Sequence, residues 1–308
     1  GCAATIDLQA HRGGRGLMPE NTLPAFANAL KLGVSTLELD TGITRDGVVV
    51  ISHDPVLNPD IVRGPGGAWL TAKGPAIHAL QFDELRQYDV GRLRPGTGYA
   101  KRYPHQQPID GSRIPRLAAL FELVAQSGNR EVHFNIETKL SPFERDQTPG
   151  PEAFVGALLQ VIDEHGMRGR VALQSFDWRT LQVAQRIAPD LPTVYLSAQQ
   201  KFLDNINAGS REGSAWTAGL NAQDFGGSVP RMVQAAGGRI WSPYFGDVTE
   251  ASLREAHGLG IQVVVWTVNE PRDIARMLDL GVDGIISDYP DRAYALISAR
   301  QLRVRSLR

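Results

Sequence analysis

The chain has 308 residues, of which 42% are hydrophobic and 21% charged, so it is long enough to bury a sizeable core and has a globular composition. Its 32 lysines and arginines nearly balance its 33 aspartates and glutamates, which argues against nucleic acid or an anionic membrane as a partner. No apolar run approaches the roughly 18 residues of a membrane-spanning helix, so we expect no transmembrane segment.

The only cysteine is Cys2, which excludes an intramolecular disulfide and a cysteine-based metal site. The chain starts at Gly1 rather than Met, and an exported precursor is one explanation. Gly1-Cys2-Ala3 fits the end of a lipoprotein signal; the alternative is a scar left by a removed tag. We therefore favour a periplasmic or exported protein, with a lipid anchor on Cys2 as one interpretation, over a cytoplasmic one.

Short apolar runs alternate with amphipathic stretches along most of the chain, a pattern typical of βα units around a parallel sheet. We predict nine strands, at residues 6–10, 36–40, 48–52, 131–137, 171–174, 193–196, 239–241, 262–267 and 284–287. The turn sequence Thr44-Arg45-Asp46-Gly47 predicts that the third of these forms an antiparallel hairpin with the segment before it. A hairpin arm cannot be a parallel barrel strand. The remaining eight strands predict an α/β fold, a TIM-type (β/α)8 barrel.

Helices are expected between these strands, most of them ended by a glycine. Their predicted positions are residues 23–32, 117–125, 153–164, 178–187, 229–236, 250–257 and 271–280. Residues 54–112 break the rhythm because they are rich in glycine and proline, with one helix expected near residues 82–88. We interpret them as an insertion after the second strand and its hairpin, within a single barrel domain of residues 1–308. Such an insertion is expected to shape substrate access.

Acidic residues gather at the predicted carboxyl ends of the strands, where TIM barrels carry their catalytic groups. Because side chains alternate along a strand, Glu38 and Asp40 share a face, and by the same parity Glu137 points inward from the fourth segment. Three inward carboxylates repel one another unless cations neutralise them, and oxygen ligands suit Mg²⁺ or Ca²⁺. The sequence therefore predicts one divalent cation at this end of the barrel. For each carboxylate alone, the alternative is a polar strand end or a surface ion pair.

His11 and His53 are the two of the seven histidines that fall at strand ends facing this mouth. A pair of imidazoles suits acid–base chemistry near neutral pH. Arg12 and Lys139 add positive charge at the same mouth, as a phosphoryl group with spread anionic charge requires.

In this order, the motifs resemble those of the glycerophosphodiester phosphodiesterase family. The matching segments are His11-Arg12-Gly13 followed by Pro19-Glu20-Asn21-Thr22, Glu38-Leu39-Asp40, Thr44-Arg45-Asp46-Gly47 leading to His53-Asp54, Arg113-Ile114-Pro115-Arg116-Leu117, and Glu137-Thr138-Lys139. Later segments are similar too: Gln174-Ser175-Phe176, Trp241-Ser242-Pro243, Trp266-Thr267-Val268-Asn269 and residues 281–290. The resemblance spans nearly the whole chain.

The resemblance implies a role for each of these residues. It places metal ligands at Glu38, Asp40 and Glu137, a general acid–base pair at His11 and His53, and phosphate ligands at Arg12 and Lys139. Glu20 and Asn21 would support the first loop, with Glu20 orienting Arg12. The alternative for this loop is a helix cap, with Asn21 or Thr22 starting the helix at residues 23–32.

Four residues at later strand ends are candidates for the glycerol pocket, with core packing as an equal alternative; they are Trp241, Trp266, Gln174 and Tyr195. Two departures from the family pattern are an extra Arg15 in the first loop and residues 106–112, which lengthen the approach to Arg113. Because neither touches a proposed catalytic position, we expect them to affect headgroup preference rather than chemistry.

The resemblance implies hydrolysis of a small-molecule glycerophosphodiester to glycerol 3-phosphate and an alcohol such as choline or ethanolamine. The nucleophile, either water or the glycerol 2-hydroxyl through a cyclic phosphate, stays open, as does the oligomeric state. One alternative is a phospholipase D-like hydrolase of lysolipids or sphingolipids, which would need an apolar surface near the mouth. Another is a catalytically silent glycerophosphodiester-binding barrel, against which the intact pair of histidines argues.

Overall fold

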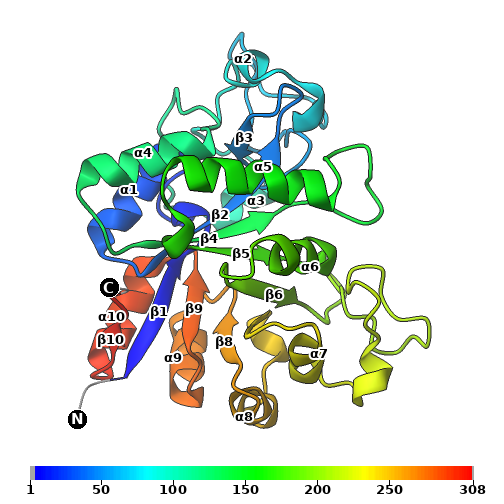
Figure 1. The fold of residues 1–308 in the computed structure, drawn as a ribbon. Coiled ribbons are helices and arrows are strands. Elements are labelled where there is room, and N and C mark those ends of the chain that lie inside the picture. Colours follow the sequence, from blue (N-terminus) through cyan, green and yellow to red (C-terminus); the bar gives the residue numbers. More distant parts are fainter. Residues whose placement is uncertain (1–3, 307–308) are drawn as a thin grey trace.

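In a computed structural model, which describes residues 4–306, eight parallel strands close into a barrel with helices around it (Figure 1). The barrel strands are β1 (Thr5–Ala10), β2 (Thr36–Ile43), β4 (His133–Thr138), β5 (Val171–Ser175), β6 (Thr193–Ser197), β7 (Ile240–Pro243), β8 (Gln262–Val265) and β9 (Gly284–Ser287). Strand β1 pairs with both β2 and β9, which closes the ring. The predicted TIM-type (β/α)8 barrel is confirmed.

The predicted hairpin is also confirmed. Strand β3 (Val49–Ile51) pairs antiparallel with the end of β2, with Thr41 opposite Ile51 and Ile43 opposite Val49. At the turn, the Val48 N–H donates to the Thr44 hydroxyl at 3.0 Å. Strand β2 therefore runs beyond the barrel, and the returning arm brings His53 back to the barrel mouth. The sequence analysis did not predict the two-residue strand β10 (Arg303–Val304), which extends the sheet beside β1.

Eight longer helices surround the barrel: α1 (Leu23–Leu32), α4 (Leu117–Ser127), α5 (Pro151–Glu164), α6 (Trp178–Ile187), α7 (Val229–Ala235), α8 (Glu250–Gly258), α9 (Pro271–Leu280) and α10 (Pro290–Ala299). Helix α10 was not predicted; it begins with Pro290 in its first turn, where a missing N–H costs no hydrogen bond. Among residues 4–306, none of the helices combines the length and apolar character needed to cross a membrane. Cys2, on which the expected lipid anchor depends, lies outside the described residues.

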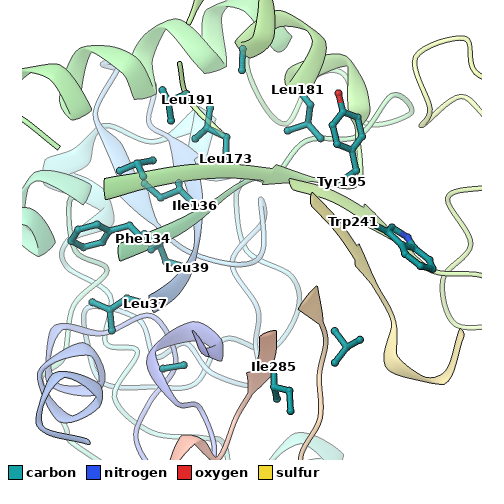
Figure 2. Packing of buried hydrophobic residues seen from close by; sticks show 14 of the residues in the cluster. Leu37, Leu39, Phe134, Ile136, Leu173, Leu181, Leu191, Tyr195, Trp241 and Ile285 are labelled. Atoms are coloured by element: carbon teal, nitrogen blue, oxygen red, sulfur yellow. The ribbon is translucent and has the colours of Figure 1, made fainter. Parts of the chain in front are cut away.

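The core lies between the barrel strands and the helices (Figure 2). Leu37 and Leu39 of β2 are buried in it with Phe134 and Ile136 of β4. Their neighbours in sequence, including Glu38, occupy the opposite face of the same strands. The alternation predicted from the sequence is therefore confirmed, and it separates an apolar outer layer from a polar barrel interior.

Residues 54–112, which we predicted to be an insertion and call the insertion below, carry the short elements η2 (Ile77–Ala79), α2 (Phe82–Leu85) and α3 (Gly98–Arg102). Together with its neighbours, it packs around a small apolar cluster apart from the barrel core, made of Val50, Leu57, Val62, Ile77, Leu80, Leu85, Val90 and Ile114. Around α3, Tyr99 and Tyr103 form a third cluster with Tyr289, which precedes α10. The insertion thus contacts the end of the barrel near the start of α10.

We expect Phe134→Ala to lower the free energy of unfolding by about 3–5 kcal/mol, because the cavity left in the core cannot fully collapse. Phe134 is fully buried and meets Phe121 edge to face at 5.0 Å between ring centroids. Phe143→Ala is the matched control, since its ring is 69% exposed, and its effect should stay within about 0.5 kcal/mol. Chemical denaturation measures both; equal effects would contradict this placement of Phe134.

Candidate active site

Adjacent strands bring three carboxylates together at one end of the barrel. Asp40 of β2 lies opposite Glu137 of β4, and Glu38 precedes Asp40 by two residues on the same face. One carboxylate oxygen of each residue lies within 4.8 Å of the other two, and all three side chains are buried. Such a group of oxygens is the donor set that hard divalent cations prefer.

Burial and mutual repulsion oppose the simultaneous ionisation of all three carboxylates. Burial, reinforced by the two neighbouring carboxylates, raises the pKa of Glu38 well above its usual value. Burial also raises the pKa of Glu137 to about 8, against the opposing charge of Lys139. Burial opposes ionisation of Asp40 too, but His53, which is protonated at the low pH where Asp40 would titrate, joins Arg12 and Lys139 in holding the pKa of Asp40 below its usual value. A bound cation would relieve this repulsion, so the residues present fit a divalent metal.

Neighbouring residues orient the carboxylates by hydrogen bonds. Glu38 accepts from the Arg12 backbone N–H and from Gln174 Nε2, both at 2.8 Å. Asp40 accepts from Asn21 Nδ2 at 3.1 Å. Arg12 and Asn21 have φ values of 52° and 55°, a left-handed conformation that is uncommon for residues with a side chain. The first loop therefore adopts an unusual backbone that aims two donors at the carboxylates.

The two roles predicted for the first loop, a helix cap and a support for the site, are filled by different residues. Thr22, not Asn21, is the N-cap of α1, and its hydroxyl accepts from the Ala25 N–H at 3.4 Å. Asn21 instead contacts Asp40, and Glu20 accepts from Arg12 Nη1 at 3.0 Å. The predicted contact between Glu20 and Arg12 is therefore present.

His11 lies between a buried carboxylate and the cavity. Its Nδ1 is 2.6 Å from Asp288 Oδ1, while its Nε2 is 3.8 Å from Glu38 Oε2. Burial lowers the pKa of His11 despite the attraction of Asp288. Because an ionised carboxylate only accepts, Nδ1 carries the proton and the Nε2 lone pair faces the cavity. A neutral ring in this tautomer can accept a proton at Nε2.

His53 is held in a similar way from the hairpin side. Its Nδ1 is 3.0 Å from Asp54 Oδ1, and its Nε2 is 3.3 Å from Lys139 Nζ. Burial, together with the charges of Arg12 and Lys139, lowers the pKa of His53 to about 3. This ring is therefore also neutral, and its Nε2 lies beside the ammonium group.

Arg12 and Lys139 place positive charge over the carboxylates. Lys139 Nζ is 3.4 Å from Glu137 Oε2, and Arg12 Nε is 3.8 Å from Asp40 Oδ2. Within the described part of the chain, buried Arg12 Nε has no hydrogen-bond partner. A buried donor without a partner is uncommon and suits an anionic oxygen that binds beside it.

These groups line one cavity of about 650 Å³ at the barrel mouth. Its walls include all three carboxylates, both histidines, Arg12 and Lys139, with Asp54, Tyr99 and Arg102 from the insertion and Gln174, Phe176, Trp216 and Trp266 from the later part of the chain. The residues that we predicted for metal, acid–base and phosphate roles thus lie together.

Two of the four candidates for the glycerol pocket line this cavity, namely Gln174 and Trp266. The placement of Trp241 there was wrong: its ring is 2% exposed, lies in the core (Figure 2) and donates from Nε1 to Ser197 Oγ at 2.9 Å. Tyr195 likewise packs in the core, edge to face with Trp178. Trp241 packs in the core between the strands and the helices, so it belongs to the outward face of β7, which continues to Pro243.

Two carboxylates behind the histidines, Asp288 and Asp54, were not predicted to have a role. Asp288 follows directly on β9, the same kind of strand end that supplied the other candidates, so its position could have identified it. The Arg15 backbone N–H donates to the His11 carbonyl at 3.2 Å, and the Arg15 side chain donates to the Asp288 carboxylate that contacts the His11 ring, at 3.0 Å from both Nε and Nη2. The expectation that Arg15 leaves the chemistry unaffected therefore no longer follows.

Comparisons with known proteins agree on one family. A sequence model described as "Glycerophosphoryl diester phosphodiesterase family" matches residues 11–292. A glycerophosphodiester phosphodiesterase of Bacillus subtilis is 28% identical over 287 residues, which cover 92% of this chain and 83% of that protein. A crystal structure of a putative glycerophosphoryl diester phosphodiesterase from Silicibacter pomeroyi superposes with a TM-score of 0.86 at 38% identity, covering 98% and 96% of the two chains.

A third similar protein is an Oleispira antarctica phosphodiesterase solved in complex with the product sn-glycerol-3-phosphate. It has a TM-score of 0.68 at 22% identity, with 96% of this chain and 97% of that chain covered. At this identity the likeness concerns the fold.

We expect Mg²⁺ or Ca²⁺ to raise the thermal-unfolding midpoint, with about 2.7 kcal/mol of stabilisation at a hundredfold excess over Kd. Glu137→Gln removes one ligand and replaces a carboxyl that repels its neighbours whenever it ionises, at a pKa raised to about 8. The metal-free variant should therefore be at least as stable as the wild type, while the metal-dependent shift is lost. Calorimetry with chelator and with each ion measures both effects. Glu250→Gln, whose side chain is 79% exposed, should keep the shift; a shift retained by Glu137→Gln would contradict this assignment.

Proposed function

The chain belongs to the glycerophosphoryl diester phosphodiesterase family and is a phosphoric diester hydrolase, and on that premise we propose that it cleaves glycerophosphodiesters to glycerol 3-phosphate and an alcohol with one divalent cation. The observation that carries this proposal is a single cavity in which three buried carboxylates face two neutral histidines and two cationic side chains. Carboxylates alone would indicate only a metal site, and the histidines and cations add what phosphodiester hydrolysis requires.

Glu38, Asp40 and Glu137 would hold Mg²⁺ or Ca²⁺, since a set of oxygen donors suits either ion. When bound, such an ion polarises a phosphoryl oxygen and lowers the pKa of a hydroxyl beside it. The hydrogen bonds from Gln174 and Asn21 keep two of these carboxylates in place before substrate arrives.

Arg12 and Lys139 would bind the phosphate oxygens. Arg12 offers its unpaired Nε, and Lys139 lies between Glu137 and His53, within 3.4 Å and 3.3 Å of their respective atoms. Both cations offset the charge that the phosphoryl group spreads over its oxygens in the transition state. Because Glu20 fixes the far end of the Arg12 guanidinium, Arg12 needs little reordering when phosphate binds.

The two histidines would transfer the protons. One ring accepts the proton of the attacking hydroxyl at Nε2. The other takes up a proton from solvent at Nε2, which the bound anionic phosphodiester would favour, and gives it to the oxygen of the leaving alcohol; the first ring then returns its proton to solvent. Asp288 and Asp54 hold the Nδ1 protons of His11 and His53, so both rings present Nε2 to the same cavity. Trp266 would provide an apolar wall for the glycerol carbons, and its indole is fixed by donating to the Ser242 carbonyl at 2.9 Å.

We expect the protein to release glycerol 3-phosphate from glycerophosphocholine in the presence of Mg²⁺ or Ca²⁺ and to lose this activity with chelator. His11→Ala and His53→Ala should each lower kcat by about 10²- to 10⁴-fold, the usual contribution of a general acid or base. An enzyme-coupled assay for glycerol 3-phosphate measures the rate.

His105→Ala is the control, because His105 is exposed on the insertion and does not line the cavity; its rate should match the wild type. If glycerophosphocholine and glycerophosphoethanolamine both bind but neither is cleaved with any metal, the protein is a silent binding barrel. Wild-type activity in His11→Ala would reject the acid–base role of this residue.

A second candidate, hydrolysis of lysolipids, is favoured by exposed aromatic residues close to the mouth. Phe143 and Phe202 are 69% and 65% exposed. Phe143 packs on Trp216, which lines the cavity, at 6.1 Å between ring centroids. Phe202 packs on Tyr244, which in turn packs on Trp266. These rings form an apolar rim that an acyl chain could contact.

If lysolipids are substrates, the rate on lysophosphatidylcholine should rise sharply once micelles form. The double variant Phe143→Ser/Phe202→Ser should lower that rate while leaving hydrolysis of water-soluble glycerophosphocholine unchanged, because the two side chains lie outside the metal and phosphate sites. Choline release measures both reactions. Equal losses on both substrates, or no release from lysolipid, would remove this candidate.

A further inference from the structure

Asp288 is a fully buried carboxylate surrounded by donors from four residues in three parts of the chain. Its Oδ1 lies 2.6 Å from His11 Nδ1 and accepts from Arg15 Nε at 3.0 Å. Its Oδ2 accepts from Arg15 Nη2 at 3.0 Å, from the Tyr103 hydroxyl at 3.0 Å and from Asn269 Nδ2 at 2.8 Å. With both oxygens saturated, the carboxylate has one available orientation, and that orientation fixes the ring of His11.

Arg15 is the partner that makes this buried charge tolerable. Its guanidinium forms a two-point contact with the carboxylate, and its side chain is 10% exposed. Burial opposes ionisation of Asp288, but Arg15 and His11 hold the pKa of this carboxyl well below its usual range. The carboxylate therefore remains an acceptor, and the proton between it and His11 belongs to the imidazole.

The insertion in turn holds Arg15. The guanidinium carbon lies over the ring of Tyr103 at 4.7 Å, and Arg15 Nη1 donates to the Tyr99 hydroxyl at 3.0 Å. Gln106 Nε2 donates to the Arg15 carbonyl at 2.8 Å. The two departures from the family pattern, Arg15 and residues 106–112, thus contact each other. Arg15 cannot shift without disturbing the insertion.

The carboxylate paired with the second histidine, His53, has fewer hydrogen-bond donors around it. His53 is 27% exposed and pairs with Asp54, a neighbour in sequence whose side chain is 34% exposed. Asp54 receives one further side-chain hydrogen bond, from Asn58 at 3.1 Å, where Asp288 receives an arginine, a tyrosine and an asparagine. The carboxylates behind the two rings therefore differ in support: the one behind His11 is fixed by distant parts of the chain, and the one behind His53 by its own loop.

We propose that Arg15 and Tyr103 are positioning residues that fix the Asp288 carboxylate and, through it, the tautomer and ring orientation of His11. The insertion thereby contributes to catalysis itself, beyond shaping access to the cavity. This inference rests on the proposed function, since it takes His11 as one of the two groups that transfer protons.

The test compares Arg15→Met, Arg15→Lys and Tyr103→Phe in the full chain with saturating metal. Arg15→Met should lower kcat on glycerophosphocholine about ten- to hundredfold with KM close to that of the wild type, the size of effect typical of residues that orient a catalytic ligand. Arg15→Lys, which keeps the charge but not the two-point contact, should recover part of the loss. Tyr103→Phe keeps the packing and removes one hydrogen bond, so its effect should be smaller.

Arg92→Met is the matched control, because Arg92 pairs with Asp110 on the exposed surface of the same insertion, and it should leave kcat unchanged. Nitrogen-15 NMR of labelled histidine provides a readout that does not depend on activity. The wild type should show His11 with its proton on Nδ1, and Arg15→Met should show a mixture of tautomers.

The outcomes separate this inference from the proposed function. If the wild type hydrolyses no diester, the proposed function fails, while the NMR comparison still decides whether Arg15 positions His11. A single Nδ1–H tautomer in Arg15→Met, or a loss of activity that appears in KM alone, would overturn the inference.

Discussion

Glu38, Asp40 and Glu137 repel one another in a space from which most water is excluded, and the structure around them is organised to hold them there. A backbone N–H and two side-chain amides donate to the carboxylates, and two cationic side chains lie within 4 Å of them. The unusual backbone of the first loop serves the same end, since it aims two of these donors inward. The repulsion between the carboxylates costs stability, and a bound cation would relieve it.

Closure of the barrel brings into contact residues that lie far apart in the sequence. Because β1 pairs with β9, His11 meets Asp288, from which it is separated by 277 positions in the sequence. Figure 1 shows these two strands side by side, the first in blue and the last in orange. The hairpin built on β2 brings His53 to the same mouth from the other side. Each histidine therefore has a carboxylate behind it, but one carboxylate comes from the far end of the chain.

Much of this arrangement could be predicted from local patterns, because strand parity needs only a few residues. Parity placed Glu38 with Asp40 and set Leu37 and Leu39 against the helices, and the Thr44 to Gly47 turn separated the hairpin from the barrel. The predicted placement of Trp241 in the glycerol pocket was wrong because β7 continues to Pro243, so the strand does not end at Trp241 as the sequence had indicated. The contacts of Asp288 and Tyr103 had no local pattern to predict them, since they arise only when the ring closes and the insertion folds back.

The distance between His11 and Asp288 along the chain also has a consequence for synthesis. A ribosome delivers β1 long before β9, so a growing chain carries the three clustered carboxylates and both histidines well before the partner of His11 exists. Pairing over 277 positions is also slow to form, because a long loop must close first. The nascent enzyme is therefore expected to stay inactive until its final strand completes the barrel, so activity is coupled to completion of the fold.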